Sequence, residues 1–270
     1  MTEKFRFNQL TWQEVNECVK ERRVVLLPVG AIEQHGPHLP LDVDTVQTQE
    51  TCERAAAAEP SLLLTMPPVH YGWVGLGLDF PGTIHISADH FIGYVTDICV
   101  SLARMGFRKV LVVNGHGGNL AALEIAGRQA VSATDAHVAL LSVWRLGKDI
   151  VDRYRESPFP GGMAHACEYE TSTYMACRPE LVKTDRIEKE MYEGAPRRWF
   201  WGDLTAESPV RMMDVASRIT TSGVSGDPTT ASAEKGEAFL QAAANDLVEI
   251  AREFQAIPIK PRRSHLQSLD

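Results

Sequence analysis

Four short runs of aliphatic residues alternate along the chain with longer amphipathic stretches, and this alternation restricts the possible folds more than any other feature of the sequence. The runs are VVLLPV from Val24, LLLTMPPV from Leu62, KVLVVN from Lys109 and HVALLSV from His137. Continuous apolar runs of this length predict strands that are buried on both faces of a sheet.

Helices are predicted between and after these strands. Apolar residues recur at steps of four and three over residues 91–105, and Ser87 is a candidate N-cap for that helix. Another helix is expected over residues 232–254, and Thr11 with Glu14 forms a candidate capping box for a short first helix. Alternating strands and helices predict an α/β fold, a three-layer α/β/α sandwich with a mainly parallel central sheet. In that architecture ligand sites lie beyond the carboxyl ends of the strands.

Composition restricts the class of protein. The 270 residues are 44% hydrophobic and 23% charged, and no linker-like tract divides them, so we expect a single domain over residues 1–270. The formal net charge of -8 argues against a nucleic-acid partner. Five cysteines without a C-x-x-C pair favour a reducing compartment. Without a signal core, or an apolar run of about 18 residues, the sequence predicts a cytoplasmic protein with no membrane partner.

Two segments show no clear secondary-structure pattern. The region from Met191 to Gly226 contains the cluster RRWFWGD and many Gly, Pro and Ser residues, so it is interpreted as a long functional loop or an interface. The basic tail IKPRRSHLQSLD is interpreted as a solvated terminus or a subunit contact.

The first predicted strand runs into a segment that is dense in possible metal ligands. LLPVGAIEQHGPHLPLDVD places Glu33, His35, His38, Asp42 and Asp44 within a dozen residues. Imidazole nitrogens and carboxylate oxygens bind zinc or manganese, and either aspartate could bridge two ions. The alternative is a polar turn whose side chains cap helices and satisfy backbone groups.

A second ligand candidate, His116, follows the strand KVLVVN within the motif GHGGN. Its glycines allow the backbone to approach a ligand closely. A phosphate-binding loop is the competing interpretation, but the sequence has neither G-x-x-x-x-G-K-[ST] nor G-x-G-x-x-G here. The sequence therefore favours a metal-ligand role for His116 over nucleotide binding.

A third cluster, GGMAHACEYETS, contributes His165, Glu168 and Glu170. If the segment is helical, His165 and Glu168 share a face while Glu170 points elsewhere. One of these residues could complete a metal shell, and His165 could transfer protons. Cys167 is a weaker candidate for a nucleophile or a ligand, and the alternative for the whole cluster is a capped helix start with solvated carboxylates.

Together these motifs resemble the creatininase (creatinine amidohydrolase) family. The resemblance is carried in family order by LPVGAIEQHGPHLPLDVD, by FPGT at residues 80–83, by NGHGGN at 114–119 and by HACEYETS at 165–172. It implies a three-layer α/β/α fold and two divalent metal ions per subunit, usually zinc with manganese or iron as alternatives. These ions activate a bridging water, and family members are typically homohexamers.

The resemblance also implies individual roles. Glu33 and His116 would hold one ion, His35 the other, and Asp44 both, while His165 would contact the substrate and move protons.

Two departures from creatinine-opening relatives stand out. Gly118 replaces a ligating glutamate, for which Glu168 is the expected substitute, with Glu170 expected beside His165 as a catalytic residue. Whether Glu168 or Glu170 completes the second shell stays open.

The second departure concerns the substrate, because Gly161 and Gly162 stand where those relatives carry a Trp-Asp pair that closes over creatinine. We therefore expect a metal-dependent amidohydrolase that cleaves a non-peptide C–N bond in a small cyclic amide, amide or formamide. The alternatives are hydrolysis of a lactone or a cyclic ketone on the same centre, or a non-catalytic metal-binding subunit. The family also includes a peptide-trimming branch.

Overall fold

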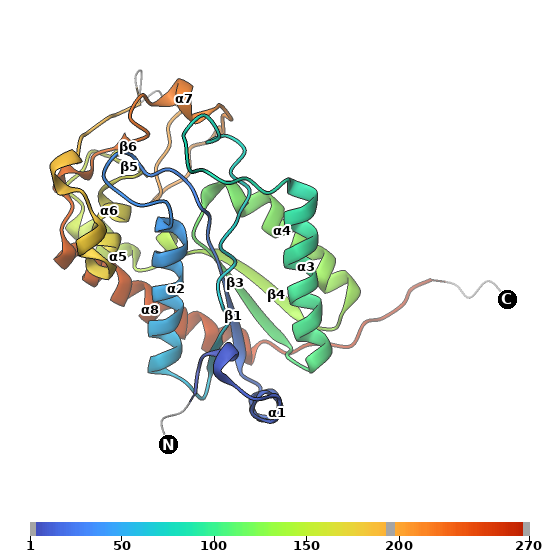
Figure 1. Ribbon diagram of the computed structural model, residues 1–270. Helices are drawn as coiled ribbons and strands as arrows, with labels where there is room; N and C mark the ends of the chain where they lie inside the picture. The colour runs from blue at the N-terminus through green and yellow to red at the C-terminus, as the bar shows by residue number, and fades with distance from the viewer. Residues whose placement is uncertain (1–3, 193–197, 267–270) are drawn as a thin grey trace.

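The computed structural model describes residues 4–192 and 198–266. A central sheet with strand order β2-β1-β3-β4 lies between two layers of helices, and every neighbouring pair of its strands is parallel (Figure 1). The predicted α/β sandwich with a mainly parallel sheet is confirmed. The strands are β1 Val24–Val29, β2 Leu63–Thr65, β3 Lys109–Asn114, β4 His137–Ser142, and a separate antiparallel pair, β5 Met163–His165 and β6 Ser225–Gly226.

Helices occupy most of the chain between these strands. The α-helices are α1 Trp12–Lys20, α2 Val43–Ala58, α3 Ala88–Met105, α4 Leu120–Ala133, α5 Lys148–Tyr154, α6 Glu168–Cys177, α7 Ala216–Ile219 and α8 Ala233–Ala256. Short 3-10 helices cover Phe7–Gln9, Gly117–Asn119, Val143–Arg145, Pro179–Leu181, Thr184–Arg186 and Pro228–Thr230.

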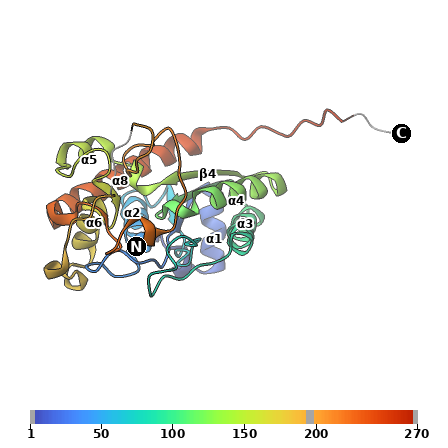
Figure 2. The same cartoon turned by 90° about the horizontal axis from the view of Figure 1, so that it is seen from above.

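The two helical layers pack on opposite faces of the sheet, as Figures 1 and 2 show. Alternate residues of β1 point to the two sides. Leu26 belongs to the core under α2 and α8, whereas Leu27 belongs to the core under α1, α3 and α4. This double burial is what the unbroken apolar runs predict for central strands.

The two outer strands differ from the prediction. In β4 the residues from His137 to Leu141 are only partly buried, because β4 is the last strand in the order β2-β1-β3-β4 and lacks a neighbour there. β2 is only three residues long, and Pro67 and Pro68 follow Met66 directly after it. Proline has no N–H to donate to a strand partner, so the ladder ends there.

The predicted helix starts are largely confirmed. The Thr11 side chain accepts from the backbone N–H of Glu14 while the Glu14 carboxylate accepts from the Thr11 N–H at 2.7 Å, which is the predicted capping box. The Ser232 side chain caps α8 by accepting from the backbone N–H of Lys235. Ser87 precedes α3 without a capping bond, because its hydroxyl lies 3.0 Å from Nδ1 of His90.

The described part of the region from Met191 to Gly226 is mostly irregular and lies beyond the carboxyl ends of β1 and β3, where Figure 1 shows α7 and β6. Residues 193–197 of that region lie outside the described residues. A backbone hydrogen bond of 2.8 Å joins Ala216 to Leu76 in the segment after β2. At the opposite edge of the sheet, the chain after α8 first passes the start of β3, where Lys109 donates to the carbonyl of Ile257, and Arg262 of the basic tail donates to the carbonyl of Thr134. The following residues extend away from the body (Figures 1 and 2), and residues 267–270 lie outside the described residues. Within the described part of the chain, no helix is long and apolar enough to cross a membrane.

Candidate metal centre

The segments after β1 and β3 meet because these strands are parallel neighbours in the sheet. β1 leads through Gly30 to Glu33 and His35, and the first turn of α2 carries Asp44. A Cβ added at Gly30 would lie 2.2 Å from Oγ1 of Thr45, so only glycine lets the backbone pass this close to α2.

Asp44 stands between two groups of potential ligands. Its Oδ1 lies 3.3 Å from Nε2 of His35, and its Oδ2 lies 3.1 Å from Nδ1 of His116. Glu33 Oε2 is 3.0 Å from the same nitrogen of His116, and Glu170 Oε1 is 3.9 Å from Nε2 of His35. The result is two triads that share Asp44, each with its ligand atoms within 4.8 Å of one another.

Several polar atoms of this cluster are buried and have no hydrogen-bond partner among the described residues. They are Oε2 of Glu33, Nε2 of His35 and Oδ2 of Asp44, and the side chains of His35 and Asp44 are only 0% and 2% exposed. Nδ1 of His35 contacts the backbone carbonyl of Glu33 at 3.1 Å. This contact orients the imidazole so that Nε2 faces the carboxylates, as second-shell contacts do in metal sites.

The electrostatics of the cluster favour positive charge. Burial opposes the charged imidazolium of His35, yet the carboxylates of Asp44, Glu170 and Glu33 raise the pKa of His35 to about 10. Against the same burial effect, Glu33 and Asp44 raise the pKa of His116. The pKa of Asp44 is lowered despite its burial because both histidines stabilise its charge. A buried site with this charge pattern is suited to cations.

Glu168 and Glu170 lie in different environments, although both are in the first turn of α6. Glu168, the expected substitute ligand, is not in the cluster, because its carboxylate faces Lys235 at 2.5 Å and accepts from the backbone N–H of Ser157 at 2.9 Å. Glu170 joins the cluster instead. His165 ends β5 rather than lying on α6, so the expected shared helix face of His165 and Glu168 does not exist.

Gln34 is a site residue that the sequence did not indicate. Nε2 of His165 lies 2.8 Å from the Gln34 backbone carbonyl. The Gln34 side chain donates to the carbonyl of Gly223 at 3.0 Å and accepts from the N–H of Gly36 at 2.9 Å. The rings of His35 and His165 have centroids 4.3 Å apart. The only signal for Gln34 was its position between Glu33 and His35, because an amide is neither an acid nor a base.

Two further candidates from the first motif have other partners. Nε2 of His38 lies 2.9 Å from the hydroxyl of Thr171. Asp42 forms an ion pair with Arg178 at 2.7 Å and accepts from the hydroxyl of Tyr174 at 2.8 Å. Of the two aspartates considered for a bridging role, the structure therefore brings only Asp44 to the cluster.

Cys167 is fully buried, with its sulfur 3.9 Å from Oε2 of Glu170. Burial, with the nearby charge of Glu170, raises the pKa of the Cys167 thiol. A thiol that stays protonated at neutral pH is a poor nucleophile and a poor ligand. This environment favours neither role.

Gly118 packs directly against the cluster. A Cβ added there would lie 2.5 Å from Nε2 of His116 and 2.7 Å from the carbonyl oxygen of Trp73. A glutamate at this position would displace His116, so the carboxylate next to His35 must come from another element. In this chain it comes from Glu170 on α6.

Comparisons with known proteins identify the family of this chain. Residues 8–251 match the family Creatininase, described as creatinine amidohydrolase. The creatinine amidohydrolase of Pseudomonas putida is 33% identical over 91% of this chain and 95% of its own length. The mycofactocin precursor peptide peptidase of Mycobacterium ulcerans (strain Agy99) is 35% identical over 84% of each chain. A solved structure described as "Creatininase Mn" is 30% identical, with a TM-score of 0.80 over 94% of this chain and 100% of the other. The chain belongs to the creatininase family of amidohydrolases.

Proposed function

We propose that this chain is a metal-dependent amidohydrolase in which two divalent cations share the carboxylate of Asp44. The observation that carries the proposal is that the two oxygens of Asp44 face different histidines, His35 at 3.3 Å and His116 at 3.1 Å. Glu33 would complete the site of His116, and Glu170 the site of His35. Glu170, expected beside His165 as a catalytic residue, is thus assigned to holding a cation.

The residues present fit such cations. Oε2 of Glu33, Nε2 of His35 and Oδ2 of Asp44 are buried without a hydrogen-bond partner, and each such atom costs about 1–3 kcal/mol when it stays unsatisfied. Imidazole nitrogen and carboxylate oxygen together suit zinc first, with manganese or iron as alternatives. Bound cations of this kind polarise a carbonyl and lower the pKa of water.

His165 is assigned the proton transfer to the leaving nitrogen. Nε2 of His165 lies 2.8 Å from the Gln34 backbone carbonyl, which accepts hydrogen bonds, and 3.0 Å from the Gln34 side-chain nitrogen, which donates them. One ring nitrogen of a neutral imidazole accepts a proton while the other donates one, so His165 can take up and release a proton. A ring nitrogen of His165 lies within 4.8 Å of ligand atoms of Glu33 and His35, which supports this role.

For the substrate we propose a small cyclic amide, amide or formamide other than creatinine. Gly161 has a φ of +98°, and a Cβ added at Gly162 would lie 2.4 Å from the carbonyl oxygen of Pro158. The Trp-Asp pair expected in creatinine-opening relatives therefore does not fit this backbone. A second candidate substrate is a short peptide, because the relative with 35% identity is named as a peptide peptidase.

The test combines metal content with turnover. We expect about two divalent ions per chain, and chelator-sensitive hydrolysis within a panel of cyclic amides, formamides, small amides, short peptides, lactones and cyclic ketones. Asp44→Asn should lose metal and turnover, whereas Asp42→Asn, which removes a carboxylate that pairs with Arg178, should keep both. Turnover of only a lactone or a cyclic ketone would show that the enzyme cleaves a C–O or C–C bond rather than a C–N bond. Bound metal without any turnover would favour a non-catalytic subunit.

The same proposal includes a cytoplasmic, single-domain chain that assembles as a homohexamer. Its support is the family resemblance and, for assembly, the partly buried edge strand β4. Light scattering of the purified protein would show six copies per particle if the assembly is right. A monomer at micromolar concentration would contradict it.

A further inference from the structure

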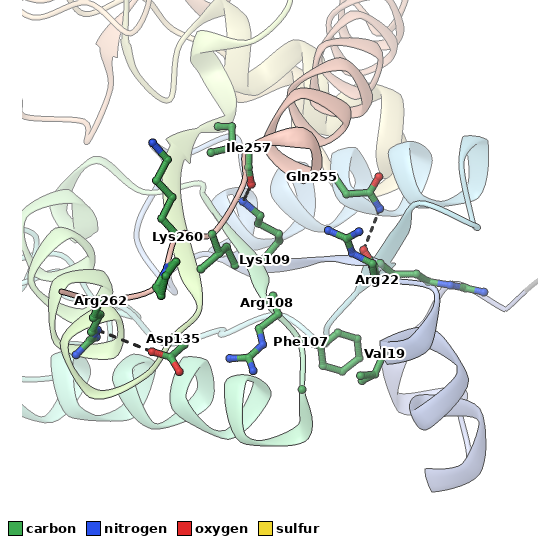
Figure 3. Close-up of a pocket in the computed structure, with 14 residues that line it drawn as sticks. Val19, Arg22, Phe107, Arg108, Lys109, Asp135, Gln255, Ile257, Lys260 and Arg262 are labelled. Atoms are coloured by element: carbon green, nitrogen blue, oxygen red, sulfur yellow. Dashed lines mark hydrogen bonds and ion pairs between the residues drawn. The ribbon is translucent and has the colours of Figure 1, made fainter.

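A cavity of about 520 Å³ lies at the edge of the sheet opposite the metal centre. Its wall includes Lys109, the first residue of β3, whereas His116 follows the last residue of that strand. A strand of six residues spans about 20 Å, so a ligand in this cavity does not reach the metal centre. Figure 3 shows the wall formed by the end of α1, the start of β3 and the tail after α8.

The wall of this cavity is strongly basic, although the chain as a whole has a net charge of -8. Asp135 is the one acidic residue among the described residues that line it. The basic residues in the wall are Arg22, Arg23, Arg108, Lys109, Lys260 and Arg262. Clustered positive charge of this kind attracts anions.

Three of these cations have no carboxylate partner among the described residues, namely Arg22, Arg108 and Lys260, and all three are exposed. In Figure 3 the guanidinium of Arg108 lies between Asp135 and Phe107. No ion pair is formed between Arg108 and a described acid, so its five N–H donors are available.

Of the other cations, Arg23 forms an ion pair with Glu21 at 2.7 Å, whereas Lys109 and Arg262 are held mainly by backbone carbonyls. Lys109 donates to the carbonyl of Ile257 at 2.6 Å, and Arg262 donates to the carbonyl of Thr134 at 2.7 Å. Arg262 lies 3.9 Å from Asp135, at the limit of an ion pair. Burial and the charge of Arg22 lower the pKa of Lys109, which is the effect expected where positive charges lie close together.

The remainder of the wall is apolar. Phe107 is buried, and Val19, Ile257, Ile259 and Pro261 complete this part of the lining. A volume of about 520 Å³ is within the range of small-molecule sites, which combine apolar walls with a few charged groups. Guanidinium groups bind phosphate in a bidentate manner, and ammonium groups bind it as point charges.

We propose that this cavity binds a small organic phosphate monoester. The phosphate would lie against Arg108 and its neighbouring cations, and the organic part against Phe107 and Val19. The site is separate from the proposed metal centre, so it does not depend on the reaction that the centre catalyses.

Titration calorimetry of the metal-loaded protein with phenyl phosphate and inorganic phosphate tests this proposal. Phenyl phosphate should bind at least about threefold more tightly, because its ring uses the apolar wall. Arg108→Glu should weaken both ligands about tenfold or more. Arg104→Glu is the matched control, because Arg104 is exposed on α3 outside the cavity wall, and it should leave both affinities within about twofold.

Several results would overturn the proposal. Absence of binding at about 1 mM ligand would do so, and equal losses in the two variants would show a general charge effect. Binding that Arg108→Glu leaves unchanged would place the phosphate elsewhere, including the metal centre. Equal affinity for phenyl phosphate and inorganic phosphate would show that the apolar wall does not bind the organic part of the ligand. If Arg108→Glu does not fold, Lys260→Glu on the exposed tail provides the same comparison.

Discussion

The ammonium of Lys235 lies 2.5 Å from Oε1 of Glu168, and both side chains are buried. The same ammonium is 2.7 Å from a carboxylate oxygen of Glu156 and donates to the carbonyl of Thr230 at 2.7 Å. Lys235 thereby ties the first turn of α6 to α8 and to the loop before β5. Because α6 is anchored in this way, Glu170 two residues later is fixed toward His35, 3.9 Å away, in the proposed metal centre.

Neutralising these two glutamates should have different effects. Glu168→Gln leaves Lys235 with a weaker partner and should lower the free energy of unfolding by about 3 kcal/mol while metal content stays normal. Glu170→Gln should lower metal content with a smaller loss of stability, because it removes a carboxylate from the cluster. Urea unfolding and metal analysis of both variants measure this. Loss of metal from Glu168→Gln, with metal retained in Glu170→Gln, would reverse the assignment.

The sequence alone did not show which of these two glutamates faces the cluster. Their spacing along the chain indicates that they point in different directions but not which of them faces the centre. Which glutamate turns away from the cluster depends on Lys235, which is 67 residues from Glu168 in the chain. The packing of α8 against α6 brings the two side chains together. A lysine inside a long amphipathic helix is typical of a solvated face, so the sequence carried no sign of this contact.

The fold was easier to predict than the site. β1 and β3 coincide with the runs from Val24 and Lys109, since every residue of both strands is buried and nearly all of them are apolar. The run from His137 looks similar in sequence, but it forms the edge strand β4. The apolar pattern of a strand does not show which strands lie beside it, so this position could not be predicted. The structure brings Glu33, His35, Asp44 and His116 together because the segments that carry them follow β1 and β3, which are parallel neighbours.

Two adjacent glycines provide a test of the packing around His116. Gly118→Ala should displace His116, since the new Cβ would lie 2.5 Å from its Nε2, and should lower metal content and turnover. Gly117→Ala should keep the wild-type metal content, because no described residue other than its two chain neighbours has an atom within 4 Å of a Cβ added there. Metal analysis of the two purified variants is the measurement. Equal metal content in both variants would mean that a side chain at position 118 does not displace His116.

Glu190 should make the stability of the loop beside the site depend on pH. Its carboxylate accepts from the N–H of Ser222 at 2.8 Å and of Thr221 at 2.6 Å. Burial opposes ionisation, but these hydrogen bonds and those from the hydroxyls of Ser222 and Thr220 lower the pKa of Glu190 to about 2. The folded pKa is below the unfolded value near 4.5, so the stabilisation is complete above about pH 4.5 and is lost as pH falls toward 2.

Glu190→Gln should therefore destabilise the protein by about 1–2 kcal/mol at pH 7, and the difference from wild type should shrink between pH 4.5 and pH 2. Urea midpoints at several pH values give this difference. Glu188→Gln is the control, because Glu188 is an exposed carboxylate in the same segment and should show no such trend. A constant difference for Glu190→Gln across the range would refute the role of its charge.

Gln34 should act on the reaction through His165. Its side chain lies 3.0 Å from Nε2 of His165 and joins that histidine to the carbonyl of Gly223, which the loop held by Glu190 provides. Gln34→Ala should lower kcat about 10- to 100-fold with little change in KM or metal content, as for other residues that orient a catalytic side chain.

A double variant distinguishes this positioning role from a general loss of structure. If Gln34 acts only by orienting His165, then Gln34→Ala combined with His165→Ala should be no slower than His165→Ala alone, because the effects of coupled residues do not add. Additive losses, or a fall in metal content that matches the fall in kcat, would show that Gln34 supports the whole centre. The rates are to be compared at equal metal loading, so that the difference reports the orientation of the imidazole and not the occupancy of the centre.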